Sequence, residues 1–326
     1  MVIFLKKDIR LKEILKKELA LIFRSKESIA VKLHMGETGN DHHLKPEFVK
    51  AVVDSLREIG TEPFLFDSPV MYGGERSTAE KYLKAAREHG FEDKVIGCPI
   101  IISDESVVVK TEHLNVEVCK PLIEADGILV LSHVKGHWCS GFGGAIKNLG
   151  MGGVSKKTKA DIHGLAGAVL TGDCKGCDTC ENVCMVGAIS MKNSKPMIGH
   201  CWGCGQCVIS CPSGSLSPKV APFETLIAEG AYAVIKGRKA YYINVLRDIT
   251  KLCDCQSDPG GIVLGDIGIL MGKDIISLEK ASLDLINKKA GRDIFKEIHK
   301  KSPLAHIKEA EKLGLGDINY IIETLS

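Results

Sequence analysis

The 326-residue sequence predicts an α/β fold, in which helices flank a mainly parallel sheet and a small cysteine-rich α+β module interrupts the chain. Short apolar runs of strand length alternate with longer segments whose apolar residues recur at helical spacing, which is typical of βαβ units. Eight of the thirteen cysteines fall between residues 174 and 211, where the alternation stops before it resumes. We therefore expect α/β segments at 1–166 and 220–326 and an inserted domain at 167–219.

The elements before the module follow in order along the chain. Pro46 stands where a helix can begin, and Gly90 follows a helical pattern that it can end. Residues 127–131 (GILVL) are almost wholly apolar, as strands buried on both faces of a parallel sheet are. Helices are expected at 9–23, 46–59 and 77–89, and strands at 28–34, 63–66, 106–109 and 127–131.

The same alternation returns after the module. Helices are expected at 223–235 and 278–288, strands at 240–246 and 262–266, and an amphipathic helical segment at 292–325. Right-handed crossovers between the strands would place helices on both faces of the sheet.

Composition excludes several classes of function. Lys and Arg total 43 against 41 Asp and Glu, a net charge of +2, so no basic excess is present to hold a nucleic acid. The longest apolar runs, such as residues 128–131, are far too short to span a bilayer. The N-terminus lacks the features of a secretory signal. We expect a soluble, cytoplasmic protein.

The cysteines of the module form two tandem motifs. They read Cys174-x2-Cys177-x2-Cys180-x3-Cys184 and Cys201-x2-Cys204-x2-Cys207-x3-Cys211-Pro212. Each matches the bacterial iron–sulfur pattern, in which three close thiolates hold one cluster and the fourth cysteine holds the other. Zinc is the main rival, because thiolates suit both metals. A four-cysteine zinc site needs pairs of CxxC, however, rather than two runs of three cysteines plus a fourth.

This spacing predicts two [4Fe–4S] clusters. The first would be held by Cys174, Cys177, Cys180 and Cys211, and the second by Cys201, Cys204, Cys207 and Cys184. Residues 174–212 resemble the two-cluster ferredoxins, although Met185 stands where proline is usual. Clusters can also serve only to stabilise a fold. Two clusters in about fifty residues exceed that need, so we favour electron transfer.

A glycine-rich stretch at 133–153 carries the other candidate site. It follows the apolar strand 127–131, and open α/β sheets bind ligands at the carboxyl ends of their strands. Seven glycines let the backbone approach an anion closely, yet neither a P-loop nor a dinucleotide fingerprint is present. The candidate ligand-binding residues are Gly141, Gly143, Gly144 and Asn148.

Two side chains of this stretch are candidates for catalysis. His137 can act as a general acid or base, and Lys147 can neutralise an anion or form a covalent adduct. The alternatives are a packed histidine and a solvated lysine. Lys32 and His34, after an early strand, are expected at the same pocket. Cys253 and Cys255 could add a metal site or a redox-active thiol pair, although buried free cysteines are common.

The sequence resembles the domain-of-unknown-function 362 family. The likeness is close at residues 135–152 (KGHWCSGFGGAIKNLGMG), extends to His163-Gly164 and to the stretch ending at Cys255, and spans roughly 30–290. The resemblance implies a fold, and for many members a two-cluster ferredoxin module, but no reaction. A fainter similarity links His137 and Lys147 to the nickel-pincer lactate racemases, in which a lysine ten residues after a histidine carries the cofactor.

These features together predict an iron–sulfur oxidoreductase. Electrons from two [4Fe–4S] clusters would reach a small anionic substrate or cofactor at the 133–153 loop, and a redox partner protein would supply them. One alternative is a ferredoxin-like electron carrier whose α/β domain only docks a partner enzyme. Another is an isomerase or racemase with a cofactor tethered near Lys147. An insertion anchored at both ends should hold the clusters at a fixed position beside the loop.

Overall fold

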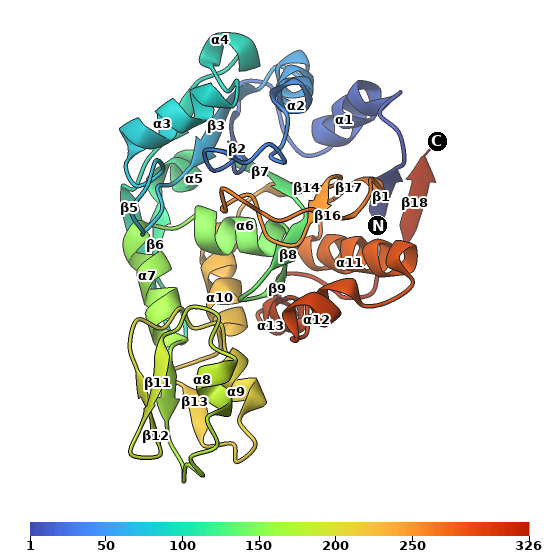
Figure 1. The fold of residues 1–326 in the computed structure, drawn as a ribbon. Coiled ribbons are helices and arrows are strands. Elements are labelled where there is room, and N and C mark those ends of the chain that lie inside the picture. Colours follow the sequence, from blue (N-terminus) through green and yellow to red (C-terminus); the bar gives the residue numbers. More distant parts are fainter. Residues whose placement is uncertain (326) are drawn as a thin grey trace.

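A single eight-stranded sheet forms the centre of the computed structural model, which describes residues 1–325 (Figure 1). One strand, β17, runs antiparallel to both of its neighbours, and the other neighbouring strands pair in parallel. The order across the sheet is β18 (Ile322–Leu325), β1 (Val2–Leu5), β17 (Gly268–Gly272), β14 (Ala240–Leu246), β7 (Gly127–His133), β2 (Ser28–Lys32), β3 (Glu62–Asp67) and β4 (Ile100–Ile102). The predicted, mainly parallel α/β sheet is confirmed.

Helices cover both faces of the sheet. Successive residues of β7 point to opposite faces, so Leu129 and Leu131 enter one apolar core while Ile128 and Val130 enter the other. The first core contains α1 (Leu11–Ala20), α2 (Pro46–Glu58), α3 (Ala79–Glu88) and α4 (Asp93–Ile96). The second contains α5 (Lys120–Glu124), α6 (Ala145–Gly152), α7 (Lys156–Leu165), α10 (Phe223–Ile235), α11 (Ile275–Ala290), α12 (Ile294–His299) and α13 (Ala305–Lys312).

Three antiparallel ribbons lie outside the main sheet. They pair β5 (Ser106–Lys110) with β6 (Asn115–Cys119), β8 (Lys135–His137) with β9 (Gly141–Gly143), and β15 (Ile249–Thr250) with β16 (Ile262–Leu264). The β8–β9 hairpin carries the first half of the glycine-rich loop. No helix within residues 1–325 is long and apolar enough to cross a membrane.

The cysteine-rich segment forms a lobe that projects beyond α7 and α10 (Figure 1). Its base is closed by backbone hydrogen bonds from Lys219 N to Gly167 O (2.7 Å) and from Val220 N to Leu165 O (2.9 Å). Its elements are β10 (Ala168–Leu170) paired with β13 (Leu216–Pro218), β11 (Ile189–Lys192) paired with β12 (Lys195–Ile198), and helices α8 (Thr179–Asn182) and α9 (Gln206–Ser210). Both ends of the lobe are therefore fixed to the α/β body.

Two expected elements differ from the structure. The strand expected at 262–266 ends at Leu264 and pairs with β15, whereas the next apolar run, β17, enters the main sheet. The helical segment expected at 292–325 ends with α13, and its last residues form β18, which pairs in parallel with β1. The predicted strand is thus present in part, outside the main sheet, whereas the helical prediction was wrong for the last residues because pairing with the distant N-terminal strand makes them a sheet strand.

Candidate functional site

A cavity of about 710 Å³ lies at the carboxyl edge of three neighbouring strands. Lys32 ends β2, Asp67 ends β3 and His133 ends β7, and all three side chains line the cavity. His34, two residues beyond β2, lines it as well. Open α/β sheets place their ligand sites at this edge. The sequence thus located the pocket, including the contribution of Lys32 and His34.

The glycine-rich loop forms one wall of this cavity. An added Cβ at position 143 would lie 2.9 Å from Lys147 Cδ, so glycine leaves room for the lysine stem. Gly141 lies away from the cavity, in contrast to its expected role in ligand binding. It turns the β8–β9 hairpin with a φ of +74°, next to Pro303, and that conformation favours glycine. The cavity residues from this loop are His137, Gly143, Gly144, Lys147 and Asn148.

The imidazole of His137 is buried and oriented by the protein. Its Nδ1 lies 3.0 Å from Ser140 Oγ, and the Ser140 hydroxyl donates to the carbonyl of Phe142 at 2.6 Å. Burial and the nearby Lys147 hold the pKa of His137 well below its usual range. The ring is therefore neutral near pH 7, with its orientation fixed from the Nδ1 side.

Lys147 is a partly buried cation without a carboxylate partner in the part of the chain that the structure describes. Its Nζ lies 3.7 Å from Cys253 Sγ. Burial lowers the pKa of Lys147 to about 8. Most of the amine is protonated at neutral pH, and a measurable fraction is a free nucleophile.

Asn148 connects helix α6 to the sheet. Its Nδ2 donates to Leu131 O and to Ser132 Oγ, both at 3.0 Å, and its Oδ1 accepts from Lys32 Nζ at 2.7 Å. Lys32 Nζ also pairs with Asp67 Oδ1 at 3.0 Å. Both ends of the Asn148 amide are thus used within the protein. We assign it to placing Lys32 rather than to direct contact with a ligand.

Arg76 is a buried cation at the cavity that the sequence reasoning did not identify. Its Nε donates to Glu37 Oε2 at 2.9 Å, and its Nη1 lies 2.6 Å from His34 Nε2. Burial and the Arg76 charge hold the pKa of His34 well below its usual range. Arg76 belongs to the loop that follows β3, so the rule that pointed to residues 133–153 also points there.

Cys253 and Cys255 lie at the same cavity, joined as a disulfide. Their sulfur atoms and a ring nitrogen of His137 all lie within 4.8 Å of one another. Asp254, between them, is buried, with Oδ2 2.9 Å from His133 Nδ1 and Oδ1 3.2 Å from Lys135 Nζ. Burial alone would raise the pKa of Asp254, but these neighbours hold it well below its usual range.

The eight cysteines of the lobe gather into two quartets in space. In the first, Cys174, Cys177, Cys180 and Cys211 line one small cavity. In the second, burial and the neighbouring thiols of Cys204, Cys201 and Cys184 raise the pKa of Cys207 to about 12. Each quartet therefore contains three cysteines of one motif and the fourth cysteine of the other, the exchange that the spacing predicts.

In neither quartet do three sulfur atoms lie within 4.8 Å of one another. Within residues 1–325, the groups of three or more ligand atoms that lie within 4.8 Å of one another include no cysteine of the lobe. Tetrahedral zinc, with Zn–S bonds of about 2.3 Å, needs sulfur atoms about 3.8 Å apart. Two such groups are present in the described chain, and both lie on the body, outside the quartets. One is the trio at the cavity (His137, Cys253 and Cys255), and the other consists of Glu112, His113 and Glu229.

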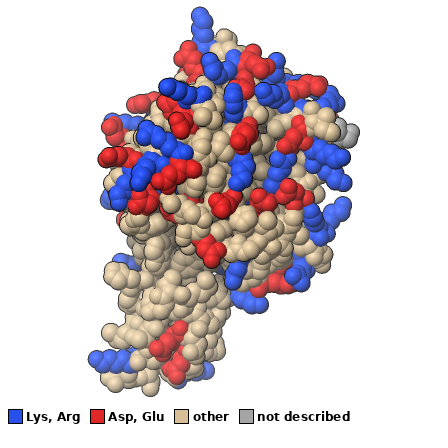
Figure 2. Space-filling view, turned by 45° about the horizontal axis from the view of Figure 1, so that its top comes forward, with Lys and Arg blue, Asp and Glu red and all other residues tan. Residues whose placement is uncertain are grey.

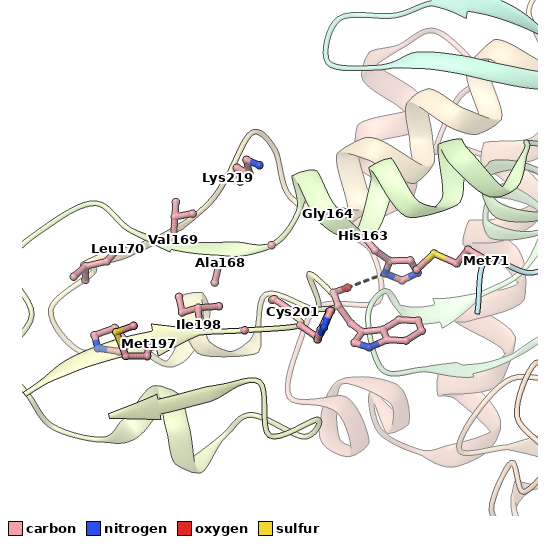
Figure 3. Close-up of a pocket in the computed structure, with 15 residues that line it drawn as sticks. Met71, His163, Gly164, Ala168, Val169, Leu170, Met197, Ile198, Cys201 and Lys219 are labelled. Carbon is pink, nitrogen blue, oxygen red and sulfur yellow. Dashed lines mark hydrogen bonds between the residues drawn. The ribbon is translucent and has the colours of Figure 1, made fainter. Parts of the chain in front are cut away.

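Trp202 connects the second quartet to the cavity. It stands between Cys201 and Cys204 in the chain and lines the cavity of about 710 Å³, called the main cavity below. The centre of its ring lies 6.1 Å from that of Trp138 and 6.0 Å from that of Tyr72. Its carbonyl accepts a hydrogen bond from His163 Nδ1 at 2.8 Å, drawn in Figure 3. The crevice of Figure 3, about 690 Å³, runs along this junction and is lined by Cys201.

A buried lysine from the C-terminal part of the chain, Lys301, connects the second quartet to the glycine-rich loop and to α10. Lys301 Nζ donates to Cys204 O at 2.8 Å and to the carbonyl of Cys139, and it pairs with Glu224 at 2.5 Å. Its position after α12 gave no signal in the sequence, because the contact joins residues about a hundred positions apart. The lobe is thus fixed against the loop at several points.

Comparison with known proteins identifies the family. The model of a domain of unknown function, DUF362, matches residues 29–284. The chain belongs to the DUF362 family. A search of functionally curated proteins finds no match to this DUF362 chain.

Solved structures offer distant likenesses to this family member. A protein of Thermotoga maritima is 14% identical, with a TM-score of 0.43, over 73% of this chain and 50% of its own. The lactate racemase apoprotein of Thermoanaerobacterium thermosaccharolyticum is also 14% identical, with a TM-score of 0.38, over 76% and 51%. The DUF362 chain spans about half the length of each.

Proposed function

We propose that this DUF362 protein is an iron–sulfur electron-transfer protein, a reductase component that passes electrons to a small anionic ligand in the cavity. One observation carries the proposal. The quartet of Cys201, Cys204, Cys207 and Cys184 lies beside a cavity lined by buried cations, with Trp202 belonging to both.

The donor set fits a ferredoxin-like module with two [4Fe–4S] clusters better than it fits zinc. Each quartet presents four thiols, and three thiols of the lobe nowhere come within 4.8 Å of one another in the described chain. That spacing is wider than one tetrahedral zinc ion uses, and four thiols per quartet is the number that each cluster takes. When bound, the clusters would supply single electrons, and the protein's own residues set where those electrons can go.

The lining of the cavity includes four cations and four carboxylates, and two of the cations have no carboxylate partner among residues 1–325. Lys32 pairs with Asp67 at 3.0 Å, and Arg76 pairs with Glu37 at 2.9 Å. Lys147 has no carboxylate partner among residues 1–325, and Lys159 Nζ bonds to Ser68 Oγ at 2.5 Å and to Val154 O at 2.8 Å. The ammonium groups of buried Lys159 and partly buried Lys147 are therefore left to neutralise a small carboxylate, phosphate or similar anion.

His137 is placed to exchange a proton with a bound ligand. Its ring lines the cavity and is neutral near pH 7, since burial holds its pKa well below its usual range. Reduction of an anion increases its negative charge, and a nearby protonated Lys147 stabilises that charge. Lys147 thus holds the ligand, while His137 accepts or relays the proton.

A redox partner would approach the lobe at its outer end. Figure 2 shows charged side chains of both signs crowded over the body, a largely uncharged flank of the lobe, and some charged side chains of both signs at the tip of the lobe. Ile209, near Cys211 of the first quartet, is 60% exposed. Weakly bound redox partners use small contact surfaces of this kind. These features support a partner protein as the electron donor.

The proposal is tested on protein purified without oxygen. We expect about eight iron and eight acid-labile sulfide per chain, and binding of sulfate or malonate that depends on Lys147. Addition of the anion should change the rate at which the reduced clusters are reoxidised. If the clusters form but no anion binds and reoxidation stays unchanged, the chain is an electron carrier whose body only docks another enzyme.

One observation favours a second candidate, an isomerase-like enzyme with a cofactor tethered at Lys147. The buried amine has a pKa of about 8 and lines a large cavity together with His137. An amine of this kind forms covalent adducts with carbonyl groups. Mass spectrometry of the intact protein tests this candidate. The unmodified chain should carry an added mass, and Lys147→Met should lack it.

A further inference from the structure

The floor of the main cavity holds a second set of soft donors, separate from the eight cysteines of the lobe. Cys253 and Cys255 meet His137 there, with all three donor atoms within 4.8 Å of one another. The donors come from the β8 strand and from a turn about 116 residues later in the chain. We propose that, once Cys253 and Cys255 are reduced, this trio binds one thiophilic divalent cation of the zinc class.

Reduction is the first step, because the two sulfur atoms are joined in the structure. A dithiol or phosphine supplies two electrons and is itself oxidised, and two protons complete the two thiols. The cation then displaces both thiol protons and bonds to two thiolates and one imidazole nitrogen. The disulfide is thus the metal-free form of the site, and the dithiol is the form that binds metal.

The turn that carries the two sulfurs is held from several sides. The Asp254 carboxylate meets His133 at 2.9 Å and Lys135 at 3.2 Å. The Asp254 carbonyl accepts from Glu37 N at 3.0 Å, and the Cys255 carbonyl lies 3.4 Å from Arg76 Nη2. A backbone held this firmly keeps both sulfurs near His137 after the disulfide is opened. Such support around the ligands is typical of metal sites.

The histidine is held in the manner of a metal ligand too. The Ser140 hydroxyl gives its hydrogen to Phe142 O at 2.6 Å, its oxygen lies 3.0 Å from His137 Nδ1, and the Ser140 backbone N–H donates to the same nitrogen at 3.2 Å. Binding of a cation at Nε2 requires the other tautomer, in which the hydrogen moves to Nδ1 and points to Ser140 Oγ. Metal-binding histidines usually donate their other ring hydrogen to such a partner.

Charge and coordination number define the class of site. Two thiolates and a dication sum to zero, so the metal removes the cost of burying two negative sulfurs. Three protein ligands leave a fourth tetrahedral position, as in catalytic zinc sites. That position faces the cavity, near Lys147, whose Nζ lies 3.7 Å from Cys253 Sγ. The open position would take water or an oxygen atom of a small anion.

This inference goes beyond the proposed electron-transfer function and uses none of its cysteines, and His137 is the one residue that the two share. The two can therefore fail separately. Iron and sulfide report on the quartets of the lobe, whereas zinc held by two sulfurs and one nitrogen reports on His137, Cys253 and Cys255.

The test uses the full chain with its iron–sulfur content measured in the same sample. Protein is reduced anaerobically with a phosphine, equilibrated with zinc ions and desalted, and its bound zinc is measured. We expect one zinc per chain more than in the unreduced sample, and X-ray absorption at the zinc edge should show two sulfurs at about 2.3 Å and nitrogen or oxygen at about 2.0 Å. No added zinc after verified reduction overturns the proposal, as does a shell of four sulfurs.

Variants identify the ligands. Cys253→Ser with Cys255→Ser should abolish the added zinc, whereas Cys98→Ala, at another buried cysteine, should retain it. Ser140→Ala should weaken zinc binding about 10- to 100-fold while leaving both sulfurs in the zinc shell. Added zinc that persists in the double variant contradicts the assignment. If the double variant does not fold, the sulfur and nitrogen count in the unmodified chain still decides the question.

Discussion

The two cysteine quartets differ in their surroundings, although their motifs are nearly the same. In the first, Cys177 is exposed, and hydrogen bonds with Ser215 and Ser213 lower the pKa of Cys211 to about 6. In the second, Cys207 is buried, and burial and its neighbouring thiols raise its pKa to about 12. Each quartet contains one buried cysteine, Cys180 in the first and Cys207 in the second, but only the first also has an exposed member.

The difference indicates a direction for electron transfer. The first quartet lies where an external protein can reach it, and the second lies where Trp202 and Lys301 connect the lobe to the cavity. We infer that electrons enter at the first quartet and leave from the second.

Loss of one ligand from either quartet should have the largest effect. Cys207→Ala and Cys177→Ala should each reduce iron from about eight to about four per chain, because each removes one cluster. Electron delivery to the cavity should be lost in both, but Cys177→Ala should retain the cluster nearer the cavity. Cys119→Ala, at a buried cysteine of the body, serves as the control and should keep all the iron. Loss of all iron in both variants would mean that the quartets do not form independently.

Removal of the cavity cation should affect the ligand and spare the clusters. Lys147→Met should weaken binding of sulfate or malonate about 10- to 100-fold, the equivalent of one charged hydrogen bond. His137→Ala should reduce turnover with little change in affinity for the anion, because His137 accepts or relays a proton and Lys147 holds the ligand. Iron content and visible absorbance should stay unchanged in both. The separation between loop and lobe is contradicted if either variant remains folded and loses its iron.

Binding of an anion should depend on pH. Burial lowers the pKa of both Lys147 and Lys159 to about 8, so their positive charges are present below pH 8 and disappear as the pH rises through 8. Affinity for sulfate, whose charge is constant in this range, should fall by up to about tenfold per pH unit for each lysine above pH 8. Calorimetric titrations at several pH values measure this. Lys147→Arg should retain more affinity at high pH, and a flat profile in the unmodified protein would exclude both lysines from the site.

Replacement of Met185 by proline should have the smallest effect. Met185 is exposed and follows Cys184, at the position where the first motif lacks the proline that follows Cys211. Its backbone N–H donates no hydrogen bond within residues 1–325, so proline removes none. Met185→Pro should leave iron content unchanged and alter the free energy of unfolding by at most about 1 kcal/mol. Denaturant unfolding measures this, and a lost cluster would show that the backbone there is not suited to proline.

Local patterns in the sequence were sufficient to predict much of the fold and part of the candidate site. The alternation of strands and helices located β7, α10 and β14, and the cysteine spacing assigned Cys211 and Cys184 to opposite quartets. The rule for strand ends placed His137 and Lys147 at the cavity. In each case the deciding information lies within a few residues of the element or follows from a general rule of folds.

Contacts between distant segments could not be predicted in this way. Strand β18 forms because its partner β1 lies at the other end of the chain. Lys301 reaches Cys204, and Arg76 reaches His34, through pairings that leave no periodic pattern in the sequence. The amide of Asn148 suggested a ligand contact, but the fold uses both of its ends to connect α6 with β2 and β7.

The central claim, that the two quartets hold two iron–sulfur clusters, is tested most directly by elemental analysis of protein purified without oxygen. We predict about eight iron and eight acid-labile sulfide per chain, with absorbance in the visible range that decreases on reduction. A colourless protein that contains zinc and no acid-labile sulfide, prepared from iron-replete anaerobic cells, would contradict the account.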